Sequence, residues 1–386
     1  MNKINKDWKE VKLGDIVDIT MGQSPKSEFY NKRNEGMPFL QGSATFGFMH
    51  PYFETYSSDI KKIAINGSVL MSVRAPVGDL NIANADVCIG RGLCSINGKS
   101  NIINRYIFYL LSYYKPKLLN MQKGTTFGAI TKDDILNFKV LIAEDIEEQK
   151  RIASTLSKID AYLENTIKLI EEKERFKRGI AKKLLTCKEG ENIPEARFKG
   201  FEDEWETKTL NSISNIKKGE QKNKLDLIAD GKYPVLNGGM NFSGYCNSYN
   251  REANTITISE GGNAGYVNFI KENFWSSGHC YTLHDLKIDK YFLYQCLKNS
   301  EKRLMKLQLG TALKNIRQSE IVEFELNIPK SIKEQEKIGG YLSLLDKEID
   351  NLKKQKELIK EMKKGAMQKL LPGEVRLSKN AFNENI

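Results

Sequence analysis

The five residues Glu148-Gln149-Lys150-Arg151-Ile152 return 186 positions further along the chain as Glu334-Gln335-Glu336-Lys337-Ile338. Each copy heads about 40 residues in which apolar side chains recur at alternating spacings of three and four, which is typical of an amphipathic helix. No proline interrupts either run before Pro372. The sequence therefore predicts two long helices, each about 60 Å in length at a rise of 1.5 Å per residue.

The repetition extends over nearly the whole chain. The offset falls from 197 residues at the first motif to 186 at the later ones, so copy one carries about eleven extra residues in its globular part. A period near 190 residues is too long for a solenoid repeat and indicates two homologous domains. The matched positions are Trp8 and Trp205, the Gly-Thr motifs at 124–130 and 310–316, and the closing pairs Leu184-Leu185 and Leu370-Leu371.

Both copies predict the same order of elements, and hence an α+β fold with two mixed α/β domains. Long, polar loops follow the first strand of each copy, and such loops on a rigid scaffold are where recognition usually resides. The expected elements are a strand (11–19 and 210–216), a loop-rich stretch (22–56 and 219–250), β-rich segments (63–73 and 255–259), a helix (about 104–121 and 289–307) and an alternating strand (138–142 and 324–328).

The two long helices are expected to pack on each other, because a lone surface helix of this length is marginal. Each helix begins at its own globular domain, so antiparallel pairing is the simplest arrangement, and it gives a pseudo-twofold coiled coil. Polar residues fall on the seams at Thr166, Lys173, Lys177, Lys356 and Lys363. The expected segments are a first domain 1–145, a helix 146–186, a linker 187–204, a second domain 205–331, a helix 332–373 and a tail 374–386.

The composition favours a polyanionic partner. The net charge is +11 and the pI is about 9.1, which suits binding to nucleic acid. No apolar run approaches the roughly 20 residues of a membrane span, and residues 1–7 hold no hydrophobic signal core. Six cysteines without a Cys-x-x-Cys pair indicate neither a disulfide framework nor a zinc ribbon. The sequence therefore predicts a cytoplasmic protein that does not enter a membrane.

Motifs of catalysis and metal binding are missing. His279, Cys280 and His284 could supply three metal ligands, but no second pair lies at ligand spacing, so a buried structural cysteine is favoured. Gly92 and Gly98 enclose five residues, whereas a Walker loop needs four, and a polar hairpin turn at Asn97-Gly98 is expected there instead. No Asn-Pro-Pro-Tyr/Phe run occurs, because none of the nine prolines follows another. These observations predict a chain without catalytic residues and without a bound metal.

The doubled order of motifs resembles the DNA-specificity subunit of type I restriction–modification systems. The matching pattern is Trp-x-x-x-x-Leu, then Gly-Thr followed by Ile, then Glu-Gln-x-x-Ile at the head of a long helix, twice over. The resemblance implies that the domains 1–145 and 205–331 are target-recognition domains for the halves of a split, asymmetric site in double-stranded DNA. It also implies that the helices are conserved spacers that dock two methyltransferase subunits.

The resemblance further implies that the chain is non-catalytic and binds no cofactor. S-adenosylmethionine, ATP and Mg²⁺ would act in the methyltransferase subunits and in the restriction and translocase subunits of the full complex. The long helices and the turns before them would contact the partners, through Gln149, Ile152, Gln335 and Ile338. Two alternatives stay open on the sequence alone, namely an enzyme with degenerate motifs and a coiled-coil scaffold with protein-binding heads.

Candidate DNA contacts are polar residues beside glycines, where the backbone approaches DNA closely. Arg74 precedes a proline turn and is aligned with Glu260, so that an arginine would pair with guanine in one half-site and a glutamate with cytosine in the other, the alternative being that Arg74 contacts only a phosphate. Copy one supplies Gln23, Ser24, Lys26, Gln41, Ser43, Arg74, Lys123 and Thr125. Copy two supplies candidate phosphate contacts, with a solvated lysine face as the alternative, at Lys217, Lys218, Lys222, Lys224, Lys306 and Lys314. The candidates for bases are Gln221, Asn237, Asn241, Glu260 and Asn263, and Thr311 is a further candidate DNA contact.

Overall fold

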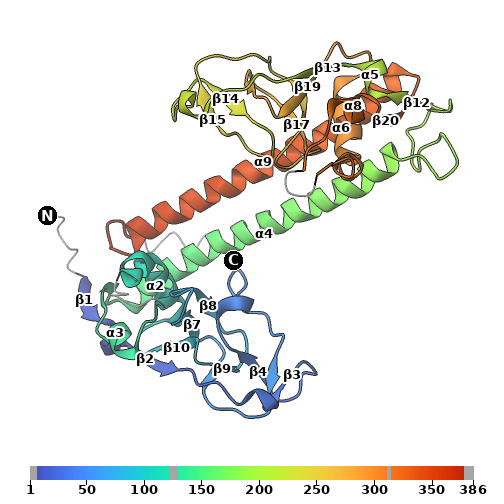
Figure 1. Cartoon of the computed structure of the whole chain (residues 1–386). Coiled ribbons are helices and arrows are strands. Elements are labelled where there is room, and N and C mark those ends of the chain that lie inside the picture. Colours follow the sequence, from blue (N-terminus) through green and yellow to red (C-terminus); the bar gives the residue numbers. More distant parts are fainter. Residues whose placement is uncertain (1–6, 121–127, 311–313, 378–386) are drawn as a thin grey trace. The chain divides into compact units, whose positions relative to one another are not determined.

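A computed structural model describes residues 7–120, 128–310 and 314–377, and the chain divides into two compact units (Figure 1). One unit consists of residues 1–167 and 354–386, and the other of residues 168–353. The long helices α4 (Ile146–Leu185) and α9 (Ile332–Leu370) each contribute a stretch to both units. The globular part before α4 is called head one below, and the globular part between α4 and α9 is called head two.

Head one is built on an antiparallel four-stranded sheet. Its elements are β1 (Trp8–Lys12), α1 (Leu13–Ile16), β2 (Val17–Met21), β3 (Tyr30–Asn31), β4 (Met37–Leu40), β5 (Tyr56–Ser57), β6 (Ile63–Ala64), β7 (Val69–Ser72), β8 (Leu80–Ile82), β9 (Val87–Ile89), β10 (Leu93–Gly98), α2 (Asn104–Leu119), α3 (Lys132–Leu136) and β11 (Lys139–Ala143), with 3₁₀ turns at Ser27–Phe29 and Ser43–Thr45. The strand order is β2-β10-β7-β8, and α2 packs against β7, β8 and β10. The pair β1-β11 and a five-stranded sheet, β3-β5-β4-β9-β6, complete the head.

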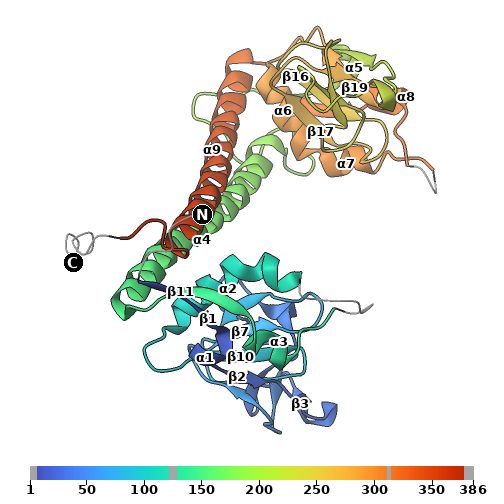
Figure 2. The same cartoon turned by 90° about the vertical axis from the view of Figure 1, so that its left-hand side faces the viewer.

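Head two repeats this plan in its own unit. Its elements are β12 (Glu206–Thr209), α5 (Leu210–Ile213), β13 (Asn215–Lys218), β14 (Tyr233–Leu236), β15 (Gly244–Cys246), β16 (Thr255–Ser259), β17 (Val267–Ile270), β18 (Trp275–Ser276), β19 (Cys280–His284), α6 (Lys290–Asn299), α7 (Glu301–Met305), α8 (Gln318–Val322) and β20 (Glu325–Ile328), with a 3₁₀ turn at Lys224–Asp226. The main sheet is β13-β19-β16-β17, and α6 lies against β17 (Figure 2). The pair β12-β20 and a three-stranded sheet, β15-β14-β18, complete the head.

Burial explains why these segments form the sheets. All four residues of β7 and all five of β16 are buried, as expected of central strands covered on both faces. Each unit has one main apolar core, which the head shares with the long helices. The indole Nε1 of Trp8 donates to the carbonyl of Leu371 at 2.9 Å, so the first strand is anchored to the end of α9 within the same unit.

The structure corrects three sequence expectations. The strand expected over 11–19 is interrupted by the helical turn α1, because Leu13 and Ile16 turn into the core together. The helix expected over 289–307 breaks at Ser300, which ends α6 and begins α7. Asn97 and Gly98 do not form a hairpin turn, since they end β10 and the chain continues into α2.

In each unit a stretch of α4 lies antiparallel to a stretch of α9, which confirms the expected pairing (Figure 1). Three of the polar seam residues, Lys173, Lys177 and Lys363, pair with a carboxylate of the other helix. Thr166 instead donates to Tyr162 O of its own helix, and Lys356 pairs with the adjacent Glu357. Asp160 on α4, which is 2% exposed, accepts from the hydroxyl of Tyr109 at 2.8 Å and pairs with Lys363 on α9 at 2.6 Å. The equivalent residues of the other unit, 186 positions away, make the same contacts. Asp346 corresponds to Asp160; it accepts a hydrogen bond from Gln295 at 2.7 Å and pairs with Lys177 at 2.6 Å. This repeated cluster ties each head helix to its helix pair.

Among the described residues, no helix combines the length and the apolar character that crossing a membrane would require.

Candidate nucleic-acid interface

In head one, the loop after β2 and the loops after β4 and β9 meet at one place. The amide of Gly22 donates to Leu93 O, and that of Gln23 to Ile89 O, both at 2.9 Å. The hydroxyl of Ser24 donates to Gln41 Oε1 at 2.8 Å and accepts from the amide of Arg91 at 3.1 Å. Only glycine fits at position 22, because a Cβ there would lie 2.1 Å from the carbonyl oxygen of Gly90.

Arg74 lies beside this cluster. It follows β7, is exposed, and forms a bridge with Ala129, while the amide of Ile130 donates to Val73 O at 3.0 Å. The amide of Val73 in turn donates to Gly92 O at 2.9 Å. Of the predicted contacts, Gln23, Ser24, Gln41 and Arg74 are therefore brought together, and Lys123 and Thr125 lie outside the described residues.

Two other predicted contacts in head one are less favourably placed. Ser43 is half-buried, and its hydroxyl donates to Asp79 at 3.1 Å. Lys26 is exposed and lies 3.7 Å from Glu28. Arg91 was missed by sequence reasoning, although its position between Gly90 and Gly92 is the same glycine signal that selected the others.

Head two builds the same cluster with the same backbone hydrogen bonds. The amide of Gly219 donates to Cys280 O at 2.8 Å and that of Glu220 to Ser276 O at 2.9 Å, so Gln221 occupies the position of Ser24. Leu236 O accepts from Ser277 N at 2.8 Å, as Leu40 O accepts from Gly90 N at 2.8 Å. Asn237 therefore stands where Gln41 stands in head one. The oxygen of its side-chain amide, Oδ1, is buried and has no hydrogen-bond partner in the described part of the chain.

The alignment of Arg74 with Glu260 is wrong by one residue. The amide of Ile316 donates to Glu260 O at 2.9 Å, as that of Ile130 does to Val73 O, and Gly265 N donates to Ser259 O as Gly78 N does to Ser72 O. Glu260 therefore corresponds to Val73, and Arg74 corresponds to Gly261. A shift of one residue at a strand end moves a side chain to the opposite face, which places Glu260 on the inner side.

Glu260 is consequently occupied by protein donors. Its carboxylate lies 2.6 Å from Lys218 Nζ, 2.9 Å from the hydroxyl of Tyr281 and 3.3 Å from His279 Nδ1. Burial acts to raise the pKa of Glu260, but the hydrogen bonds from Lys218 and Tyr281 and the charge of Lys218 outweigh it and leave the pKa lowered. Oε1 of Glu260 is therefore already occupied by two protein donors, which disfavours the prediction that Glu260 accepts from a cytosine.

The prediction that Lys217 and Lys218 both contact phosphates also has to be corrected. Lys217 and Lys218 are consecutive residues of β13, so their side chains point to opposite faces of the sheet and do not form one phosphate-binding pair. Lys306 and Lys314 are exposed on either side of residues 311–313, which lie outside the described residues together with the predicted contact Thr311. Asn241 and Asn263 are exposed in the loops of head two.

The four predicted partner contacts are interior residues. Gln149 and Ile152 are 0% exposed, Gln335 is 4% exposed and Ile338 is 0% exposed. Gln149 clamps the head to its long helix, because its amide donates to Ala143 O at 2.9 Å and accepts from Ile103 N at 3.2 Å. Gln335 does the same in its unit with Pro329 O and Asp289 N, at 2.8 and 2.9 Å. The prediction that these four side chains contact a partner is therefore wrong, and they stabilise the junction between each head and its long helix instead.

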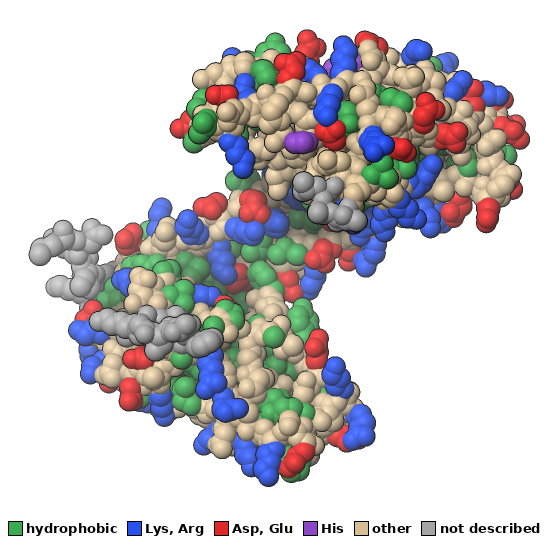
Figure 3. Space-filling model, viewed as in Figure 1, with side chains coloured by type: hydrophobic (Ala, Val, Ile, Leu, Met, Phe, Trp, Pro, Cys, Tyr) green, Lys and Arg blue, Asp and Glu red, His purple; other side chains and the backbone are tan. Residues whose placement is uncertain are grey.

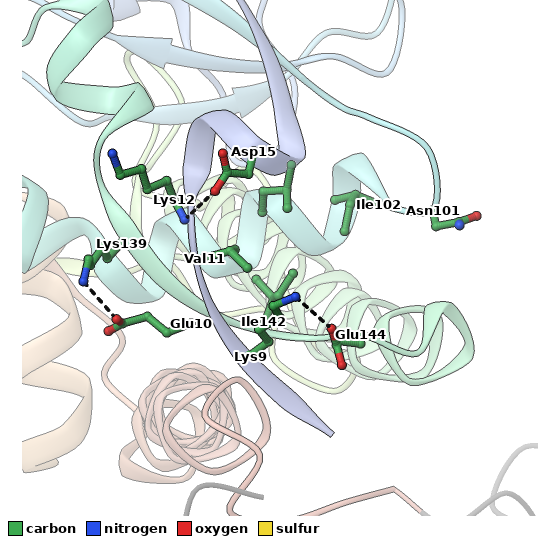
Figure 4. A pocket seen from close by; sticks show the side chains of 11 residues that line it. Lys9, Glu10, Val11, Lys12, Asp15, Asn101, Ile102, Lys139, Ile142 and Glu144 are labelled. Carbon is green, nitrogen blue, oxygen red and sulfur yellow. Dashed lines mark hydrogen bonds and ion pairs between the residues drawn. The ribbon is translucent and has the colours of Figure 1, made fainter. Parts of the chain in front are cut away.

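Charge does not single out another binding site on the face shown in Figure 3, where Lys and Arg side chains are spread over both units. A hollow of about 560 Å³ lies on head one over β1 and β11 (Figure 4). Its charged side chains pair with one another, since Lys139 lies 3.2 Å from Glu10 and Lys9 lies 3.7 Å from Glu144. Because these charges are paired within the protein, the hollow has little net charge with which to attract an ionic ligand.

The possible metal ligands are not gathered into a site. Cys280 is 0% exposed, which confirms the buried structural cysteine, and burial raises the pKa of its thiol to about 11. Within residues 7–120, 128–310 and 314–377, no group of three or more His, Cys, Asp or Glu side chains is arranged to hold a metal ion.

Comparison with known proteins identifies the family. A model described as the type I restriction modification DNA specificity domain matches residues 5–172 and again residues 202–361. The MjaX specificity subunit of a type I restriction enzyme of Methanocaldococcus jannaschii, as that protein is named, is 44% identical over 191 residues, which cover 49% of this chain and 45% of that relative. This chain therefore spans less than half the length of that relative.

Two further comparisons extend over almost the full length. The MjaVIII specificity subunit of the same organism is 24% identical over 411 residues, covering 98% of this chain and 96% of the relative. The crystal structure of a type I restriction–modification S subunit from M. genitalium shares the fold, with a TM-score of 0.72, 20% identity and coverage of 96% and 97%. The chain belongs to the family of type I restriction modification DNA specificity domains, of which it carries two copies.

Proposed function

We propose that this chain is the non-catalytic subunit that directs a type I restriction–modification complex to a bipartite, asymmetric site in double-stranded DNA. The observation that carries the proposal is the loop cluster that both heads build with equivalent backbone hydrogen bonds and fill with different side chains. Head one presents Gln41, Arg74 and Arg91 at positions where head two has Asn237, Gly261 and Gly278. A shared framework with different side chains suits two heads that read different bases.

The proposal divides the work between this chain and its partners. Phosphate contacts would position the loops, and amide or guanidinium groups would pair with base edges in the major groove. S-adenosylmethionine, ATP and Mg²⁺ would act in methyltransferase and restriction subunits. Methylation mapping of cells that carry the complex is the experiment, and the expected result is two short half-sites separated by unread bases. A continuous motif, or methylation independent of this chain, would contradict the proposal.

Two copies of a methyltransferase subunit would dock on the exposed apolar residues of the long helices. Phe176 on α4 is 53% exposed and Met362 on α9 is 49% exposed, although both are large apolar side chains. They are 186 positions apart, so they are equivalent in the repeat, and two identical partners could each use one of them.

The test of this docking is copurification with the partner. Phe176→Ser combined with Met362→Ser should release both methyltransferase copies, and either change alone should release one. Leu225→Ser is the matched control, because Leu225 is 89% exposed but lies in head two outside the helices. Retention of two partner copies by the double variant would exclude this surface.

A further inference from the structure

A cluster of charged and polar side chains in head two replaces an apolar contact of head one. In head two, Lys218 is paired across the sheet with Tyr281, and both contact Glu260. The equivalent pair in head one is Met21 and Cys94, which lie opposite each other in β2 and β10. The counterpart of Glu260 is Val73 and that of His279 is Gly92, so head one has no charge at any of these positions.

The cluster is arranged with its carboxylate inside and its nitrogen donors outside. The Glu260 side chain is 13% exposed, whereas those of Lys218 and His279 are 47% and 53% exposed. Tyr281 is buried beneath them. Lys218 and Tyr281 both donate to Oε1 of Glu260, and His279 Nδ1 lies 3.3 Å from Oε2, so the carboxylate is held beside the Lys218 ammonium group.

We propose that Lys218 reads a guanine in the half-site of head two and that Glu260 is the positioning residue that orients it. This inference rests on the proposed function. An ammonium group has three donors and no acceptor, and one donor is used by Glu260, so two remain for the ligand. Guanine offers the adjacent acceptors O6 and N7 in the major groove, whereas cytosine offers a donor, N4, that an ammonium group repels.

The location of Lys218 supports readout at the loop cluster. Lys218 ends β13 and immediately precedes Gly219 and the loop that carries Gln221. The guanidinium of Arg251 donates to the carbonyl of Lys218 at 3.0 Å, so the backbone that carries this ammonium group is fixed as well. Fixing both the backbone and the side chain favours a specific base contact, because less conformational freedom is lost on binding.

Phosphate oxygens are also acceptors, so the experiment has to distinguish a contact of Lys218 with a guanine from a contact with a phosphate. Methylation sites are mapped for complexes that contain the full chain with Lys218→Met, Lys218→Arg or Glu260→Gln. Lys218→Met and Glu260→Gln should each relax one guanine position in a single half-site, with a loss of about tenfold in discrimination. Lys218→Arg should keep the guanine. Arg74→Ala identifies the half-site of head one, so the relaxed position must lie in the other half.

Two further variants distinguish the loss of a base contact from a general disturbance of the fold of head two. The combination Lys218→Met, Glu260→Val and His279→Gly introduces residues that head one already carries at these positions, and it should relax the same guanine while remaining folded. Lys271→Met is the matched control, since Lys271 is an exposed lysine of head two paired with Asp350 at 2.7 Å. It should leave the motif unchanged.

The outcomes are distinct. An unchanged motif with uniformly weaker methylation at every site would mean a phosphate contact and would overturn the inference. An unchanged motif with unchanged methylation, or relaxation in the half-site of head one, would also overturn it. A wild-type complex without a bipartite motif would instead show that the proposed function itself is wrong.

Discussion

Removing the ammonium group of Lys363 tests the polar cluster that joins head one to its helix pair. Lys363→Met leaves Asp160 with Tyr109 as its donor, in a site where Asp160 is 2% exposed. Breaking a buried ion pair by removing one partner costs about 3–5 kcal/mol. The remaining bond to Tyr109 compensates in part, so a loss of about 3 kcal/mol is expected. For a unit of this size that corresponds to a lower Tm by roughly 6–12 °C.

The assay is thermal unfolding of matched variants. Lys360→Met is the control, because Lys360 lies one turn earlier on α9 in a solvent-exposed pair with Glu357 and should change the stability very little. Lys363→Met combined with Asp160→Leu should recover most of the loss, since no buried charge is left unpaired. Equal Tm values of the Lys363→Met and Lys360→Met variants would refute a stabilising role of the buried ion pair. A double variant with the same Tm as Lys363→Met alone would refute it as well.

Three further substitutions test other parts of the account. Arg74→Ala should relax one base in the half-site of head one, as methylation mapping would show, whereas an equal loss at all sequences would indicate a phosphate contact. Lys217→Ala should lower the salt slope of DNA binding by about one unit if Lys217 touches one phosphate, and an unchanged slope would remove it from the interface. Arg197→Ala should destabilise its unit by about 3 kcal/mol, because Glu334 is 1% exposed and accepts from Arg197 at 2.7 and 2.8 Å. Unfolding at the wild-type temperature would contradict that role.

The long helices could be predicted because one periodic pattern specifies them over about 40 residues. Lys173, Lys177 and Lys363 could be located on the seam, but their ion pairs could not be predicted, since the partners are far away in the sequence. Lys177 and Asp346 are 169 positions apart, and no local pattern connects them. The antiparallel pairing followed from chain connectivity.

The site was predicted in part. The glycine beside Gln41 and the proline turn after Arg74 selected two residues that the structure places close together, although their contact with DNA stays a prediction. The one-residue error at Glu260 arose because the heads differ in sequence there, and only backbone hydrogen bonds fix the register. Gln149 was misplaced for a different reason. A polar residue in a repeated motif suggests a surface contact, whereas here it satisfies backbone groups inside the fold.

The central claim is that each head reads one half of the DNA site through its loop cluster. Its most direct test is methylation mapping of a variant in which Gln41→Asn, Arg74→Gly and Arg91→Gly give head one the residues found at the equivalent positions of head two. One half-site should change, while the other half-site and the spacer between them should stay the same. A change in both half-sites, or an unchanged motif, would contradict it.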